Sequence, residues 1–221
     1  MKGVFEKRPS LPRNNVTWDT SVVLNYLRTL SPLAKLTLKM LTLKTVTLVA
    51  LLSAQRAQTI HLLSLEHVTA SSSYYKFRIP HPIKTTKPGK HIQELELAAY
   101  PEDETLCIVT TLDEYIKRTH DLRGKENAVF ITFTKPYHAA SKSTISRWIK
   151  TTLSEAGVDM NIFTPHSTRA ASTSKADTRV PLETILKTAA WSGESTFRKF
   201  YNKPIHKIGE FGLSVVDNVK N

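Results

Sequence analysis

The stretch Thr164–Tyr201, TPHSTRAASTSKADTRVPLETILKTAAWSGESTFRKFY, decides how the rest of the chain is interpreted. Its opening Thr164–Pro165 pair predicts a helix start, with threonine as the N-cap and proline in the first helical position. His166 and Arg169 follow at a spacing of three, which places both on one face of that helix. Backbone N–H groups and the dipole at a helix start favour a phosphate. Tyr201 is therefore a candidate nucleophile towards a phosphate bound there.

Composition indicates a globular protein with a polyanionic partner. The chain has 221 residues, enough for one large domain with a full core. It carries 31 Lys and Arg against 19 Asp and Glu, a net charge of +12. Such an excess favours nucleic acid as a partner over a membrane surface. Charge alone is equally compatible with a basic protein whose charged face is only solvated.

The single cysteine and the absence of metal-binding motifs exclude further classes of protein. A single cysteine, Cys107, excludes an internal disulfide and indicates a reducing compartment. Its apolar helical surroundings predict a buried structural thiol. The sequence has no C-x-x-C or H-E-x-x-H motif, so we expect no metal and no other cofactor. The N-terminus lacks an apolar signal core, and the charge-free run between Lys44 and Arg56 is short against the ~20 residues of a membrane span. We expect a soluble intracellular protein that binds neither a membrane nor a small-molecule substrate.

The pattern of elements predicts a mainly α-helical domain with one small sheet. A helix begins near Trp18 and stops before Pro32. Segment 36–55 fits both the alternation of a strand, at Leu36, Leu38 and Leu43, and a helical stripe, and its length and lack of Gly and Pro favour a second, buried helix. Three later segments separated by polar turns predict a three-stranded antiparallel sheet. The strands are SLEHV (64–68), YYKFRI (74–79) and HIQELEL (91–97).

Further helices are expected after the sheet. They run from Pro101 to before Gly124, from a Ser143 cap to Gly157, through His166 and Arg169, from Pro181 onward, and from about Gly193 to Lys203. We expect residues 1–16 to form a basic arm, 17–204 the folded domain and 205–221 a short tail.

Six positions, in order, resemble the catalytic domain of tyrosine recombinases, the phage-integrase family, which shares chemistry with type IB topoisomerases. The resemblance runs from about Trp18 to Pro204 and predicts that 17–204 is such a catalytic domain. The six positions are Arg56 after a buried helix, Lys84 on the turn between the second and third strands, His166 and Arg169 in an H-x-x-R motif, Trp191, and Tyr201. The segments HSTRAASTSKA, AAWSGESTFRKFYNKP and KGVFEKRPSLPR also resemble the DIRS-type retrotransposon recombinases of eukaryotes, which implies a nuclear location.

The resemblance implies that Arg56 and Arg169 clamp a scissile phosphate. Arginine offers a planar fork of donors that fits two phosphate oxygens and stays charged at any working pH. Trp191 can donate only through its indole N–H, so it would supply one phosphate hydrogen bond and packing. Judged singly, each of these residues also fits an ordinary packing or pairing role.

The resemblance also implies the path of the protons. Tyr201 would attack the phosphate and His166 would accept its proton, while Lys84 would protonate the departing 5′ oxygen. Lys87 and Lys90 lie on the same turn, so they are alternatives to Lys84. The products would be a 3′-phosphotyrosyl enzyme and a free 5′-hydroxyl.

The sequence departs from the family pattern in two places. Many members have an acid three residues after the first arginine, where this chain has Thr59. The Trp191–Tyr201 interval is ten residues, where nine is commoner, and this resembles the DIRS form. In addition, members clamp DNA with a preceding core-binding domain, which we expect to be absent because only residues 1–16 precede the resemblance.

Three functions follow as expectations. The first is a DNA recombinase or integrase on double-stranded DNA, a homo-tetramer when bound and a monomer when free. The second is a DNA-binding remnant of a mobile element with weak or no catalysis. The third is topoisomerase IB-like cleavage and religation of one strand.

Overall fold

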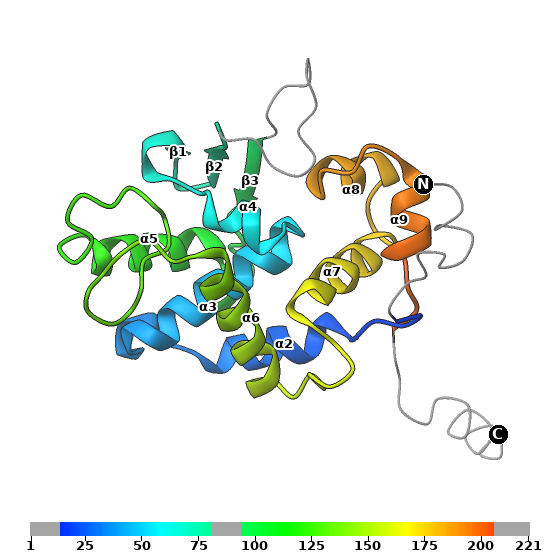
Figure 1. The fold of residues 1–221 in the computed structure, drawn as a ribbon, viewed down its shortest axis with the longest axis horizontal. Helices are drawn as coiled ribbons and strands as arrows, with labels where there is room; N and C mark the ends of the chain where they lie inside the picture. Colours follow the sequence, from blue (N-terminus) through cyan, green and yellow to red (C-terminus); the bar gives the residue numbers. More distant parts are fainter. Residues whose placement is uncertain (1–13, 81–93, 206–221) are drawn as a thin grey trace, which may run out of the picture.

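The central element of the molecule is a long buried helix, α3 (Leu38–Ser53), against which α5, α6 and α7 pack (Figure 1). The computed structural model describes residues 14–80 and 94–205 of the chain. The Thr37 side chain caps α3 by accepting a hydrogen bond from the Met40 N–H. Apolar residues all round such a helix are typical of a core element. The predicted buried helix is confirmed.

Other helices surround α3, and the predicted class, mainly α with one small sheet, is confirmed. The remaining α-helices are α2 (Thr20–Thr29), α4 (Ala57–His61), α5 (Ile108–Thr119), α6 (Lys142–Glu155), α7 (Thr168–Ala176), α8 (Leu182–Thr188) and α9 (Glu194–Phe200). Short 3₁₀ helices are η1 (Leu33–Lys35), η2 (Leu65–His67), η3 (Glu104–Leu106) and η4 (Pro165–Ser167). Within the described ranges, no helix has the length and apolar character needed to cross a membrane.

The sheet is three-stranded and antiparallel, as predicted, and its strand order is β1-β2-β3. Its strands are β1 (Val68–Ala70), β2 (Tyr74–Arg78) and β3 (Glu94–Ala98). Tyr75 pairs with Leu97 and Phe77 with Leu95, and all four side chains are buried on the core side. Alternate residues point to opposite faces of a strand, which explains the alternating sequence pattern.

Three predicted element starts were wrong, and local capping explains each. The segment before β1 is η2 rather than strand, because the Ser64 side chain accepts from the Glu66 N–H. The segment after Pro101 forms η3, capped by Asp103, and α5 starts only afterwards. The cap of α6 is Ser141, whose hydroxyl accepts from the Thr144 N–H, rather than Ser143.

Among the described residues, buried apolar side chains form two separate clusters. The main cluster joins α2, α3, α5, α6 and the sheet, and includes Cys107, which is buried as predicted. The small cluster consists of Ala54, Ile185, Ala189, Trp191 and Phe197. In Figure 1 its helices α8 and α9 lie together at the opposite side of the molecule from α5.

One lysine is fully buried in the main cluster. Lys44 on α3 donates from Nζ to the carbonyl of Leu30 at 2.7 Å. Burial lowers the pKa of Lys44 to about 8, and the negative charge of Asp103 opposes that change. The lysine therefore supplies a hydrogen bond to a carbonyl at the C-terminal end of α2. Burying its charge costs free energy.

The segment before α2 lies against the segment after α9. Thr17 pairs with Ile205 in a parallel bridge, and the Thr17 N–H donates to the Pro204 carbonyl at 2.9 Å. The Trp18 Nε1–H donates to Ser167 Oγ at 2.8 Å. The two ends of the described chain thus meet beside η4.

Candidate active site

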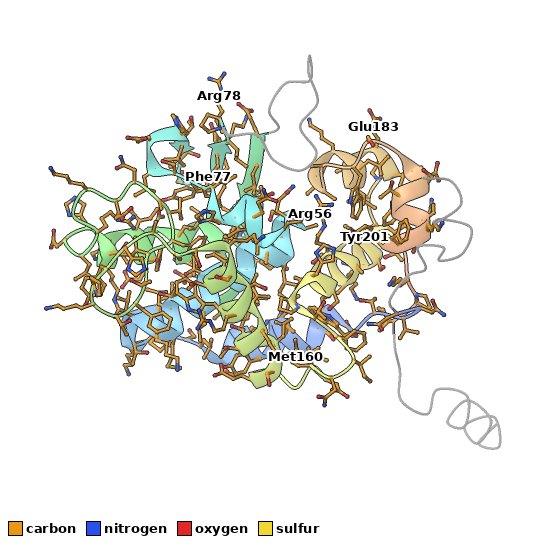
Figure 2. All side chains as sticks on the ribbon, in the orientation of Figure 1. Arg56, Phe77, Arg78, Met160, Glu183 and Tyr201 are labelled. Atoms are coloured by element: carbon orange, nitrogen blue, oxygen red, sulfur yellow. The ribbon has the colours of Figure 1, made fainter. Side chains whose placement is uncertain are left out.

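Five of the six predicted site residues lie on α4, η4, α7, and around α8 and α9. Figure 2 shows Arg56 and Tyr201 on the side of the molecule where α7, α8 and α9 gather. The sixth residue, Lys84, and its alternatives Lys87 and Lys90 lie outside the described residues. Their role stays a prediction.

Arg56 occupies the N-cap position of α4, directly after a sharp turn. Helix α3 ends at Ala54, whose φ of 49° lies in the left-handed region. That conformation costs an L-residue other than glycine about 1–2 kcal/mol. The next residue, Gln55, fixes the turn by donating from Nε2 to the Thr188 carbonyl at 2.6 Å. The Arg56 side chain remains partly exposed.

Arg169 is the most buried charged residue of the site, with 1% of its surface exposed. Its Nη2 donates to the Ala189 carbonyl at 2.7 Å, at the end of α8. Nε and Nη1 are buried without a hydrogen-bond partner in the described structure. Burial lowers the pKa of Arg169 to about 10, with the positive charge of Arg56 acting in the same direction and Tyr201 opposing both effects. The guanidinium is therefore still charged at neutral pH.

A buried guanidinium with two donor atoms that make no hydrogen bond lowers the stability of the folded protein. Leaving buried donors unsatisfied costs about 1–3 kcal/mol each, and more for a charged group. Nε and Nη1 lie on different edges of the guanidinium, so a bound oxyanion would accept from one of them, in a charge-assisted hydrogen bond. The positive charge of Arg56 lies close enough to lower the pKa of Arg169, so the two cations are neighbours.

Trp191 adds a third donor without a hydrogen-bond partner, beside Arg169. Its indole is buried, and Nε1 has no hydrogen-bond partner among the described residues. Ala190, with a φ of 56°, turns the chain after α8 and delivers Trp191 to the site. The Arg169 guanidinium carbon lies 4.9 Å from the Trp191 ring centroid, in cation–π contact. The role of Trp191 towards a phosphate stays a prediction.

Tyr201 follows directly after α9 and joins these groups. Its ring centroid lies 4.3 Å from that of Trp191 and 5.4 Å from the Arg169 guanidinium carbon. Its hydroxyl lies 3.1 Å from Nε2 of His166, within hydrogen-bonding distance. A neutral imidazole with an unprotonated Nε2 accepts the tyrosine proton at this distance.

The backbone around His166 differs from the prediction. Pro165 does occupy a first helical position, but the helix is η4, and the Thr164 side chain makes no capping bond. Arg169 belongs to α7, which begins after η4. The tight 3₁₀ turn leaves the His166 ring exposed on the surface while Arg169 is buried.

Sequence reasoning missed the residues that hold the site together. Ser174 Oγ donates to the Tyr201 carbonyl at 2.8 Å and accepts from the Lys203 N–H at 2.9 Å. Gln55 links the α3–α4 turn to α8. No spacing pattern could have indicated these bonds, because they join positions far apart in the chain. In the described ranges, no group of three His, Cys, Asp or Glu side chains is arranged to hold a metal ion.

The site thus combines buried cationic and indole donors with a tyrosine–histidine pair. Comparison with protein-family models matches residues 25–206 to the phage integrase family. The chain belongs to the phage integrase family. Membership places it among the tyrosine recombinases, with the predicted fold. In this family member Thr59, which stands where many members carry an acid, is buried in α4.

Solved structures of tyrosine recombinases share this fold. The post-cleavage complex of XerH recombinase with palindromic difH has a TM-score of 0.63 at 12% identity, covering 93% of this chain and 52% of XerH. XerA recombinase has a TM-score of 0.62 at 16% identity, covering 97% and 66%. A lambda integrase tetramer bound to a Holliday junction has a TM-score of 0.50 at 12% identity, covering 87% and 50%.

The chain therefore spans about half of XerH and two thirds of XerA. No curated protein sequence matches the chain.

Proposed function

We propose that the chain is the catalytic domain of a site-specific DNA recombinase that acts through a 3′-phosphotyrosine intermediate. The observation that carries this proposal is the set of three buried, unpartnered donors, Arg169 Nε, Arg169 Nη1 and Trp191 Nε1, beside the Tyr201–His166 pair. Donors arranged in advance around a reacting phosphate stabilise the charge of its transition state. A tyrosine hydroxyl close to them provides the nucleophile.

The reaction is balanced by groups of this chain. The Tyr201 oxygen attacks phosphorus, and its proton passes to His166 Nε2. The bond between phosphorus and the 5′ oxygen then breaks, and that oxygen takes a proton, in our proposal from Lys84. Rejoining reverses these steps with the 5′-hydroxyl of another strand, so the phosphodiester energy is kept in the phosphotyrosine bond.

Arg56 and Arg169 act on the non-bridging oxygens. Removing one such donor typically reduces the rate about 10²–10³-fold. Because Arg169 is buried and fixed to Ala189, its guanidinium needs little rearrangement when phosphate binds. Arg56 is partly exposed and approaches the same place from the α3–α4 turn.

We further propose that the active form is a tetramer on double-stranded DNA and that the chain derives from a DIRS-type retroelement acting in the nucleus. Support for assembly comes from lambda integrase, which is a tetramer on a Holliday junction. Support for the DIRS origin comes from the resemblance of segments such as HSTRAASTSKA to the recombinases of those elements. Joining of two target sites in one reaction would separate a recombinase from a topoisomerase-like enzyme, which relaxes supercoiled plasmid without joining sites.

The decisive experiment measures a covalent protein–DNA adduct on nicked suicide DNA. We expect the native protein to form an adduct that survives denaturant, and Tyr201→Phe to reduce it at least about 10³-fold, because no hydroxyl remains to attack. Tyr100→Phe is the matched control, since Tyr100 is exposed and far from the site in sequence.

The outcomes separate the candidates. DNA binding without any adduct would favour the catalytically inactive remnant. An adduct that persists in Tyr201→Phe would show that another residue is the nucleophile.

A further inference from the structure

The nucleophile is held by a side chain that the phosphate chemistry does not use. Helix α9 ends at Phe200, and Tyr201 has a φ of −127°, outside helical geometry. Its N–H still donates to the Phe197 carbonyl of α9 at 2.8 Å, so the helix holds the amide side of Tyr201. Ser174 on α7 holds the other side, because one hydroxyl bonds both the Tyr201 carbonyl and the Lys203 N–H.

A second contact reinforces the same attachment. Asp177, one helical turn after Ser174, accepts from Asn202 Nδ2 and from Arg198 Nη1, each at 3.0 Å. Residues three apart on a helix lie on one face, so Ser174 and Asp177 present a common edge to segment 198–203. The same helix carries Arg169 in its first turn.

We propose that Ser174 is a positioning residue that sets the distance from the Tyr201 oxygen to the phosphate held by Arg169. This inference rests on the proposed function. Arg169 and Ser174 lie on the same helix, α7, so the bond from Ser174 to the Tyr201 backbone connects the nucleophile to the phosphate site through one element. A displacement of roughly 1 Å of a reacting group costs about 10²-fold in rate. The loss of two hydrogen bonds at the base of the tyrosine permits a displacement of that size.

The test compares two serines of α7. Ser174→Ala removes both bonds, and we expect adduct formation with nicked suicide DNA to slow about 10- to 100-fold at unchanged DNA affinity. Ser172→Ala is the matched control, because Ser172 Oγ makes no hydrogen bond within the described structure. It should stay within about twofold of the native rate, since it removes a hydroxyl that has no partner to lose. Ser174→Thr keeps the hydroxyl and should restore most of the rate.

A second assay removes the tyrosine from the chemistry. DNA ending in a 3′-p-nitrophenyl phosphate is joined to a 5′-hydroxyl strand: the 5′-hydroxyl releases its proton to solvent, its oxygen attacks phosphorus, the bond to the aryl oxygen breaks, and p-nitrophenolate leaves. Protein with Tyr201→Phe should catalyse this joining through its phosphate-binding groups. Adding Ser174→Ala to Tyr201→Phe should leave the joining rate within about threefold, because no tyrosine remains to be positioned.

The results separate a positioning role for Ser174 from general support of the pocket. If joining in the double variant falls as far as adduct formation in Ser174→Ala, Ser174 supports the whole pocket and the proposal is overturned. A native adduct rate in Ser174→Ala would overturn it too. Absence of an adduct with the native protein, together with absence of joining by Tyr201→Phe, would instead refute the proposed function.

Discussion

The main cluster and the small cluster differ in how they are stabilised. The main cluster packs α2, α5, α6 and the sheet around α3. Among the described residues the small cluster has five buried members, and its helices α8 and α9 have seven residues each. A cavity of about 440 Å³ lies between α3 and α8. Leu51 and Leu52 of α3 line one side, and Thr184 and Ile185 of α8 line the other. Side-chain hydrogen bonds also connect the segments that carry the small cluster to α7 and to the α3–α4 turn. They involve the side chains of Gln55, Arg169, Ser174 and Asp177.

This difference assigns different tasks to the two regions. Arg56 and Arg169 come from elements packed on the main cluster, whereas Trp191 and Tyr201 belong to or pack against the small one. Regions with few buried apolar contacts open at low free energy. We infer that Arg56 and Arg169 are held rigidly and that Trp191 and Tyr201 can move without unfolding the domain.

The largest expected effect is on the main cluster. Leu48→Ala deletes a fully buried side chain of α3, and we expect the free energy of unfolding to fall by about 2–5 kcal/mol. Urea denaturation measures the change. Leu52→Ala, one turn later on the same helix and 47% exposed, should change it by less than about 0.5 kcal/mol. Equal losses would contradict the assignment of α3 as the core.

A smaller, local effect is expected in the small cluster. Phe197→Ala removes a fully buried ring from α9. We expect amide hydrogen exchange in 194–200 to accelerate at least about tenfold, or about 1.4 kcal/mol, while exchange in α3 is unchanged. If α3 loses protection to the same extent, the two clusters unfold as one unit and the comparison fails.

The smallest expected effect concerns Lys44, the buried lysine of the main cluster. It has a folded-state pKa of about 8 against 10.5 when solvated, so the unfolded chain binds more protons at this site. Stability therefore rises with pH through this window, by about 1 kcal/mol between about pH 7 and 9. Lys44→Met removes the titrating group, and the difference in unfolding free energy between native protein and variant should follow that slope. A flat difference would show that Lys44 is solvated in the native state.

Long, regular segments of the fold were predictable from the sequence. Helix α3 follows from a long Leu- and Val-rich segment without Gly or Pro, and the sheet from alternating residues between turns. Starts of elements were less predictable, because neighbouring polar residues compete for one capping role. Ser141 and Ser143 are an example, since both lie at the start of α6 and only the first accepts from the Thr144 N–H.

The candidate site was predictable as a set of residues and not as a geometry. Family order identified five residues that the fold brings together, Arg56, His166, Arg169, Trp191 and Tyr201. The burial of Arg169 and the unpartnered indole N–H of Trp191 depend on how α8 ends. Just after the helix, Ala190 adopts the left-handed conformation, which the sequence does not indicate because alanine rarely adopts it. The contacts of Ser174 need the tertiary structure, because its partners lie 27 and 29 residues away.

The bridge between Thr17 and Ile205 offers a place at which movement of the segment that carries Tyr201 can be measured. Ile205 lies four residues after Tyr201, so we expect an outward movement of the nucleophile segment to separate this pair. Because bridged residues are in contact, a fluorophore at one position and a contact quencher at the other would convert that movement into a rise in fluorescence. The distance between these two positions thus reports, one molecule at a time, whether the tyrosine is in place.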